Sequence, residues 1–143
     1  MINIQLLEEL YDKHCKTGFT YTYGTAGFRY KADVLDTVMF TTGILAAIRS
    51  IYLKGQYVGV MITASHNPPQ DNGVKIVDPK GEMLDQAWEP FATELANSAS
   101  KGKQELIKAL DELITKLGID DTESAKITIS RDSRESGPRL LQA

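Results

Sequence analysis

Residues 57–84, YVGVMITASHNPPQDNGVKIVDPKGEML, decide the fold because they place two apolar segments on either side of a polar loop. The first segment, 57–62, is rich in β-branched residues and too short for a helix, so we expect a buried strand. The second, 74–77, predicts another strand. Between them, two consecutive prolines restrict the backbone, and residues 71–73, DNG, predict a tight turn. The stretch therefore predicts two strands joined by a stiff loop that carries Ser65.

Ser65 and Lys75 are the residues of this stretch that suggest a chemical role. A stiff loop positions a serine hydroxyl at little entropic cost, and the second strand would return Lys75 toward it. An ammonium group beside the hydroxyl would favour a phosphoryl group there. The plainer alternative is an ordinary loop serine and a solvated strand lysine.

The residues before this stretch predict a helix, a strand and a second helix. Apolar side chains recur at helical spacing within residues 2–16, and Gly18 is a candidate C-cap. Residues 19–23 alternate aromatic residues and threonines and predict a strand. Residues 34–53 show a long helical pattern. This order of elements is typical of an α/β unit.

The predicted strand at 19–23 leads into Gly24-Thr25-Ala26-Gly27-Phe28-Arg29. Two glycines allow the backbone to approach a neighbour closely, and Arg29 supplies a fork of N–H donors that suits an anion. The alternative is a bent strand that ends in a surface arginine.

After residue 77 the chain predicts a turn, a short strand and a helix. Residues 78–81, DPKG, favour a type I turn, so 82–84 should pair back as a hairpin. An apolar stripe of Trp88, Phe91 and Leu95 then predicts a helix that Asp85 is placed to cap. The polar residues 97–102 predict a loop between this helix and the next.

The last third of the chain predicts a helix and a strand. Residues 106–117 carry leucines at helical spacing, and Gly118 ends the pattern. Residues 125–130 predict a strand that leads into 131–137, RDSRESG, with the first turn of a helix after it.

The expected fold is therefore α/β, a three-layer α/β/α domain with a mixed sheet. The loops that carry Arg29, Ser65 and Arg131 should gather at one edge of that sheet.

Composition excludes several classes of protein. The 143 residues are 42% hydrophobic and 24% charged, as in one globular domain with a core. A net charge of −3 does not favour a nucleic-acid or anionic-membrane partner. One cysteine, Cys15, rules out an intrachain disulfide. We expect no signal peptide, no membrane span and a cytoplasmic location.

The serine loop resembles the phosphoserine loop of the α-D-phosphohexomutases, which carry Thr-x-Ser-His-Asn-Pro followed by Asn-Gly-x-Lys. These positions are present here from Thr63 to Lys75. Gly24 to Arg29 is similar to the family's Gly-Thr-x-Gly-x-Arg, and residues 131–136 resemble its Gly-Arg-Asp-x-Arg-x-Ser loop, with Ser130 in place of the first glycine. Such long composite motifs are seldom accidental.

Two further features resemble the branch of the family that acts on N-acetylglucosamine phosphates. One is the continuation of the motif through residues 77–84. The other is the order of the motifs, because residues 131–136 follow the serine loop here and precede it in most family members.

The resemblance implies a catalytic role for Ser65 as a phosphoserine that exchanges its phosphoryl group with a hexose phosphate through a bisphosphate intermediate. Magnesium would bind through the phosphate on Ser65, with its remaining ligands outside this chain. Arg29 and Lys75 would stabilise the charge in transfer or assist the movement of a proton. His66 joins the catalytic set, although its expected part is to shape the loop, since successive residues of an extended chain point apart.

Three more residues are implied to bind substrate or phosphate: Asn67 in the serine loop, and Arg131 and Arg134 in the C-terminal motif. The implied product feeds the synthesis of UDP-N-acetylglucosamine.

The family enzymes have four domains, and the Asp-x-Asp-x-Asp-Arg metal loop of their second domain is absent here. We therefore expect residues 1–143 to be a first domain, shortened near its C-terminal end, whose partners are domains II–IV and which is inactive alone. The alternatives are a phosphoglucomutase or phosphomannomutase, a phosphate-binding domain without catalysis, and an α/β domain whose serine loop is purely structural.

Overall fold

The structure is a computed structural model that describes residues 3–64, 66–119 and 123–143, so the candidate nucleophile Ser65 lies outside the described residues. Its elements are α1 (Ile4–His14), β1 (Phe28–Lys31), the 3-10 helix η1 (Ala32–Val34), α2 (Asp36–Tyr52), β2 (Tyr57–Ile62), β3 (Asp71–Val77), the 3-10 helix η2 (Gln86–Trp88), α3 (Glu89–Lys101), α4 (Lys103–Leu117), β4 (Lys126–Arg131) and α5 (Gly137–Gln142).

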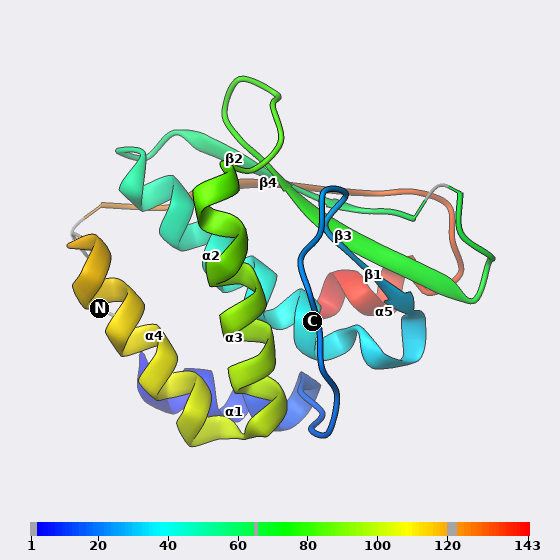
Figure 1. The fold of residues 1–143 in the computed structure, drawn as a ribbon, viewed down its shortest axis with the longest axis horizontal. Coiled ribbons are helices and arrows are strands. Elements are labelled where there is room, and N and C mark those ends of the chain that lie inside the picture. Colours follow the sequence, from blue (N-terminus) through cyan, green and yellow to red (C-terminus); the bar gives the residue numbers. More distant parts are fainter. Residues whose placement is uncertain (1–2, 65, 120–122) are drawn as a thin grey trace.

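The four strands form one mixed sheet in the order β1-β3-β2-β4. Strand β3 pairs antiparallel with both β1 and β2, while β2 and β4 are parallel. In Figure 1 the sheet crosses the upper right of the view, and the labelled helices lie below it. This arrangement confirms the expected α/β class with a mixed sheet. It also places the carboxyl ends of the parallel strands β2 and β4 side by side.

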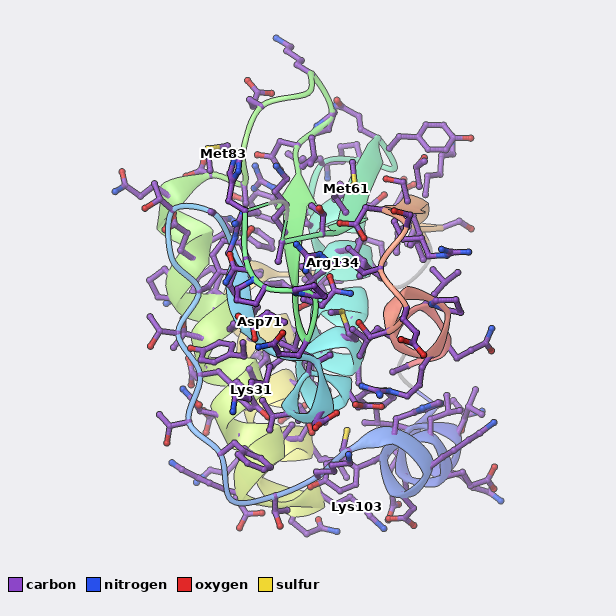
Figure 2. The ribbon with its side chains drawn as sticks, turned by 90° about the vertical axis from the view of Figure 1, so that its right-hand side faces the viewer. Lys31, Met61, Asp71, Met83, Lys103 and Arg134 are labelled. Carbon is purple, nitrogen blue, oxygen red and sulfur yellow. The ribbon has the colours of Figure 1, made fainter. Side chains whose placement is uncertain are left out.

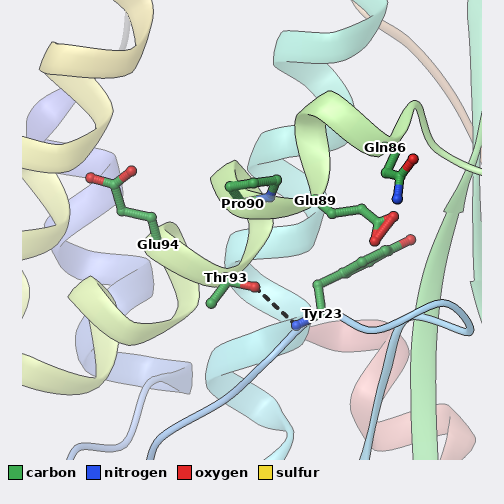
Figure 3. Close-up of a pocket in the computed structure, with 6 residues that line it drawn as sticks. All are labelled: Tyr23, Gln86, Glu89, Pro90, Thr93 and Glu94. Atoms are coloured by element: carbon green, nitrogen blue, oxygen red, sulfur yellow. Dashed lines mark hydrogen bonds between the residues drawn. The ribbon is translucent and has the colours of Figure 1, made fainter.

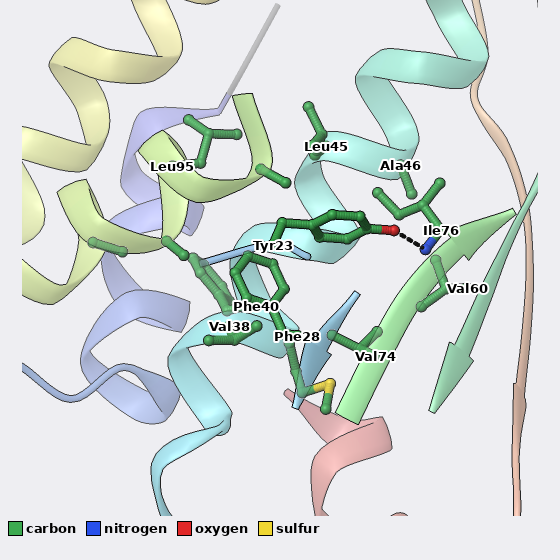
Figure 4. Close-up of a cluster of buried hydrophobic side chains, with 14 of the residues drawn as sticks. Tyr23, Phe28, Val38, Phe40, Leu45, Ala46, Val60, Val74, Ile76 and Leu95 are labelled. Atoms are coloured by element: carbon green, nitrogen blue, oxygen red, sulfur yellow. Dashed lines mark hydrogen bonds between the residues drawn. The ribbon is translucent and has the colours of Figure 1, made fainter. Parts of the chain in front are cut away.

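One face of the sheet packs against α2 and forms the core. In β2 the buried side chains alternate, with Val58 and Val60 directed inward and Tyr57 62% exposed. This period of two is what a strand with one covered face requires. Figure 4 shows the inward side chains of β3, Val74 and Ile76, meeting aromatic residues of the core. Each fully buried side chain of this size contributes about 1.5–3 kcal/mol.

A buried ion pair joins α2 to the end of β3. Arg49 Nε and Nη2 donate to the two carboxylate oxygens of Asp78 at 3.0 and 2.8 Å, and both side chains are 7% exposed. The Arg49 guanidinium also lies 4.7 Å from the centre of the Trp88 ring, and the backbone N–H of Asp85 donates to Asp78. Two-point geometry and added hydrogen bonds are what a buried charge pair needs to be stable.

The strand expected at residues 19–23 is wrong, because side chains of α3 take the place of a partner strand. Ser100 accepts from the N–H of Phe19, Asn97 bonds to both backbone groups of Tyr21, and Thr93 accepts from the N–H of Tyr23. Figure 3 shows the last of these bonds. The segment is extended, yet its hydrogen bonds go to a helix.

The same contacts explain a second error, the polar break expected at residues 97–102. Asn97 to Lys101 lie within α3, and the break is Gly102 alone, which ends α3 and precedes α4. Polar side chains occur in this helix because the extended segment needs hydrogen-bond partners.

Other boundaries differ by a few residues. Helix α1 ends at His14, so Gly18 is not its C-cap, because the chain turns away to exchange two hydrogen bonds between the Lys16 backbone and the Thr37 hydroxyl. The turn at 78–81 is confirmed by the bond from Gly81 N–H to Asp78. The strand expected at 82–84 is reduced to one bridge, between Val77 and Met83.

The expected end of α4 is confirmed, because Gly118 adopts the left-handed conformation there. Asp85 accepts from the N–H of Ala87 and so caps the 3-10 helix η2, which leads into α3, whereas α3 itself has Trp88 at its N-cap position and no side-chain cap. Within the described ranges, no helix has the length and apolar character that a membrane crossing requires.

Candidate active site

The serine loop connects β2 to β3 and contains two backbone turns. Asn67 N–H donates to the Ala64 carbonyl at 2.7 Å, and Asp71 N–H donates to the Pro68 carbonyl at 3.0 Å. The tight turn expected at 71–73 is wrong, because these residues are the first three of β3 and pair with β1. The direction of the chain is reversed earlier, by the turns that contain the prolines.

Gly73 is a glycine because two backbone carbonyls leave no room for a side chain. A Cβ there would lie 2.4 Å from the Phe28 oxygen and 2.8 Å from the Thr63 oxygen. Gly27 has a φ of +84°, and a Cβ on it would lie 2.2 Å from the Val74 oxygen. Both glycines let the segment that carries Arg29 approach the base of the serine loop.

Arg29 reaches the serine loop directly. It pairs with Gly73 in the sheet, and its Nη1 donates to Asn67 Oδ1 at 3.3 Å. Asn67 in turn donates to the Asp71 carboxylate at 3.2 Å. The Nε atom of Arg29 is buried and has no hydrogen-bond partner among residues 3–64, 66–119 and 123–143. A buried N–H of this kind is an available donor for an anion.

Lys75 shares a face of the sheet with Arg29. It lies two residues after Gly73, the partner of Arg29, and opposite Met61 of β2. Its neighbours Val74 and Ile76 point into the core, so Lys75 points to the other face and is half-buried. The fold therefore brings two cationic side chains to one surface beside the loop.

Arg134 binds the serine loop from the other side. Its Nη1 donates to the carbonyls of Pro68 at 2.7 Å and Asp71 at 3.3 Å, and its Nη2 donates to those of Ala64 and Asn67. Figure 2 shows Arg134 beside Asp71. The loop is thus held to the segment that follows β4.

Asp132 stands between the loop and Arg134. Its carboxylate accepts from the Thr63 hydroxyl at 2.7 Å and from the Arg134 N–H at 3.0 Å. Partial desolvation raises the pKa of Asp132, but these two hydrogen bonds and the charge of Arg134 outweigh it, so the net pKa lies below the usual value. The carboxylate is ionised at neutral pH.

Among the described residues, neither Arg131 nor His66 makes a side-chain hydrogen bond to Arg29, Lys75 or Arg134; Arg131 donates to the Asp132 carbonyl at 3.2 Å. Arg131 pairs with Ile62, whose side chain points into the core, so Arg131 extends from the sheet face opposite to Lys75. It is exposed, and its side chain lies against Gly137 of α5. His66 is exposed in the loop. Roles for both residues in binding or catalysis stay predictions.

The sequence patterns indicated no role for Thr63 or Asp132, which are joined by a hydrogen bond. They also did not predict the hydrogen bond from Asn72 Nδ2 to the Ser136 hydroxyl at 2.9 Å. The sequence feature that could have identified Thr63 and Asp132 is their position directly after a predicted strand. Thr63 follows β2 and Asp132 follows β4, and residues at the carboxyl ends of adjacent parallel strands meet at one edge of a sheet.

In the described ranges, no three His, Cys, Asp or Glu side chains are grouped so as to hold a metal ion. A shallow hollow of about 470 Å³, shown in Figure 3, lies elsewhere, along the start of α3. Its lining residues are Tyr23, Gln86, Glu89, Pro90, Thr93 and Glu94, and none is a candidate site residue.

Comparison with known proteins places this site in a family. The family model described as "Phosphoglucomutase/phosphomannomutase, alpha/beta/alpha domain I" matches residues 22–105, a range that includes Arg29, Lys75 and the serine loop. That description agrees with the three-layer fold class expected from the sequence.

Curated relatives carry the name phosphoacetylglucosamine mutase. The Candida albicans protein is 54% identical over 97% of this chain, and the Saccharomyces cerevisiae protein is 53% identical over 99%. The chain spans only 27% and 26% of the length of these two relatives.

Solved structures agree closely with the fold. An N-acetylglucosamine-phosphate mutase in the apo form, described as a member of the alpha-D-phosphohexomutase superfamily, superposes with a TM-score of 0.93 at 53% identity. The superposition covers 99% of this chain and 31% of that one. An Aspergillus fumigatus N-acetylphosphoglucosamine mutase in complex with GlcNAc-6P and magnesium gives a TM-score of 0.88 at 44% identity, over 99% of this chain and 26% of that one. By its motifs, its fold and the family model that covers more than half of it, the chain belongs to the phosphoglucomutase/phosphomannomutase family of α-D-phosphohexomutases.

Proposed function

We propose that the chain is the first domain of a phosphoacetylglucosamine mutase, which interconverts N-acetylglucosamine 6-phosphate and 1-phosphate through a phosphorylated Ser65. The observation that carries the proposal is the setting of the serine loop. Arg29 bonds to Asn67 within the loop, and Lys75 lies on the same face of the sheet. The names of the relatives support the choice of sugar.

The proposed reaction is a reversible phosphoryl transfer. A free hydroxyl group of the sugar phosphate attacks the phosphorus on Ser65, and the bond from that phosphorus to the serine Oγ breaks. The proton that the hydroxyl loses is matched by one that the serine Oγ takes up. The resulting bisphosphate reverses its orientation in the site and returns its other phosphoryl group to Ser65. Arg29 and Lys75 stabilise the negative charge in transfer, which is the main task of a protein in such chemistry.

Two solved structures of one relative support this cycle. A serine-to-alanine variant of the Aspergillus fumigatus protein is in complex with glucose 1,6-bisphosphate, a compound of the class that the cycle requires as its intermediate. The same enzyme has been solved with GlcNAc-6P and magnesium. Here magnesium would bind an oxygen of the Ser65 phosphate, with its other ligands supplied by domains II–IV. The enzyme would act in the cytoplasm, on the route to UDP-N-acetylglucosamine.

The test is the substitution Ser65→Ala, made in the four-domain enzyme of which residues 1–143 are proposed to be the first domain. The unchanged protein should acquire phosphate at Ser65 from a sugar bisphosphate, detected as a phosphopeptide by mass spectrometry. Ser65→Ala should lose both the phosphopeptide and the mutase activity. Ser98→Ala, a substitution in α3 distant in sequence from the loop, is the control and should keep both. Mutase activity that survives Ser65→Ala would refute the proposal.

The choice of sugar is tested separately. Turnover of N-acetylglucosamine 6-phosphate should exceed turnover of glucose 6-phosphate and mannose 6-phosphate under the same conditions. Faster turnover of glucose or mannose phosphate would make the protein a phosphoglucomutase or phosphomannomutase. Phosphate binding without turnover of any of the three sugars would favour a binding domain.

A further inference from the structure

The guanidinium of Arg134 is directed at backbone carbonyls rather than at open space. A guanidinium has five N–H groups, of which four are on the terminal nitrogens. Each terminal nitrogen of Arg134 donates to two carbonyl oxygens of residues 64–71. The remaining nitrogen, Nε, lies 3.4 Å from the Asp132 carboxylate, and the Arg134 side chain is 13% exposed.

The four carbonyls belong to the two turns of the serine loop. Ala64 and Asn67 stand on either side of Ser65 and His66 in the sequence, and Pro68 and Asp71 bound the second turn. The carbonyls of Ala64 and Pro68 each accept a backbone N–H of their own turn as well as an N–H of Arg134. One side chain therefore bonds both turns at once.

Arg134 is itself held in place. Its backbone N–H donates to Asp132, whose carboxylate also accepts from Thr63 and so connects the end of β2 to the same cluster. Arg29 and Arg134 each have a buried Nε atom without a hydrogen-bond partner within the described residues, so the two arginines differ at their terminal nitrogens. Within the described residues, the terminal nitrogens of Arg29 make one hydrogen bond, to Asn67, and so have donors left for an anion, whereas those of Arg134 make four to the loop carbonyls.

We propose that Arg134 is a positioning residue, which fixes the shape of the serine loop through the carbonyls of Ala64, Asn67, Pro68 and Asp71 and does not bind the phosphate of the substrate. An effect of Arg134 on catalysis rests on the function proposed above, but its hydrogen bonds to the loop carbonyls do not depend on that function. A lysine at this position keeps the charge and cannot reproduce a planar fork that bonds four carbonyls.

The test compares Arg134→Lys with the unchanged protein by hydrogen exchange of the Asn67 and Asp71 amides, which close the two turns. Both amides should exchange at least about tenfold faster in the variant. In the active enzyme, kcat should fall by about 100-fold while KM changes by less than about twofold. Arg139→Lys is the control, because Arg139 bonds to Ala32 and Asp36 outside the loop. It should leave loop exchange unchanged.

Unchanged exchange at Asn67 and Asp71 in Arg134→Lys would overturn the proposal. If KM rises in that case, Arg134 binds phosphate, as its sequence motif implies. Because hydrogen exchange needs no substrate, it tests the contact even in a protein without mutase activity. If Arg134→Lys does not fold, Asp132→Asn replaces it in the same comparison. Faster exchange at the two amides is again expected, and unchanged exchange again overturns the proposal.

Discussion

Gly73 shows how closely the backbone segments at the site are packed. Two carbonyl oxygens, from Phe28 and Thr63, occupy the space that a β-carbon on this residue would need. Neither is the end of a flexible side chain, so neither can move without shifting β1 or the start of the serine loop. Gly43 in α2 is a useful contrast, because a β-carbon there would meet no atom within 4 Å.

Gly73→Ala should therefore lower the free energy of unfolding, by about 1–3 kcal/mol, through overpacking. The matched control Gly43→Ala should raise it by up to about 1 kcal/mol, because alanine is the better helix former. Urea denaturation of the two variants measures both effects. Equal stability of Gly73→Ala and the unchanged protein would contradict this prediction, because it would mean that the backbone around Gly73 moves at no cost to make room for a β-carbon.

At the scale of elements, runs of β-branched residues predicted the strands β2 and β4, whereas the prediction failed where side-chain hydrogen bonds decided the structure. Strands β2 and β4 begin and end within one residue of their predicted positions. Residues 19–23 have the composition of a strand, but their backbone partners are Thr93, Asn97 and Ser100. These residues are spaced by four and three along one face of α3. Composition within a segment carries no information about such a distant partner.

The ion pair of Arg49 and Asp78 gives a prediction at this scale, since it joins α2 to the end of β3. Asp78→Ala should lower the free energy of unfolding by about 3–5 kcal/mol, because it leaves a buried guanidinium without its carboxylate. The double variant Arg49→Met with Asp78→Leu should cost less than Asp78→Ala alone, since no charge then remains buried. Thermal or urea denaturation measures both.

Lys103→Ala is the control for the ion pair, because the contact of Lys103 with Asp12 is exposed to solvent. Such contacts are weak in water, so this variant should unfold close to the unchanged protein. A double variant of Arg49 and Asp78 that is less stable than Asp78→Ala would mean that the pair itself, and not the unpaired charge, determines stability here.

For the whole molecule, the sequence located the site but not its internal connections. The motif around Ser65, the guanidinium of Arg29 and the position of Lys75 were all available from residue types and spacing. The bonds from Arg134 and Asp132 to the loop were not, since they depend on β4 lying parallel to β2. Arg131 and Arg134 are three residues apart in one motif, yet of the two only Arg134 bonds to the described residues of the loop.

The whole-molecule prediction is that residues 1–143 alone do not interconvert N-acetylglucosamine phosphates. Phosphoryl transfer requires charge neutralisation and positioning by several groups, and the described residues include no cluster able to hold a metal ion. Adding a separate protein that supplies domains II–IV should restore turnover in a coupled assay. Turnover by residues 1–143 in the absence of that protein would contradict the prediction.

The contact between Arg134 and the serine loop also bears on how the protein is made. Arg134 follows Ala64 by 70 positions, with α3 and α4 between them. A ribosome that adds about 5–20 residues per second leaves roughly 4–14 seconds between synthesis of the loop and synthesis of Arg134. During that interval the nascent loop lacks the four hydrogen bonds that join its turns. The serine loop can therefore gain these four hydrogen bonds only after the C-terminal motif has been translated.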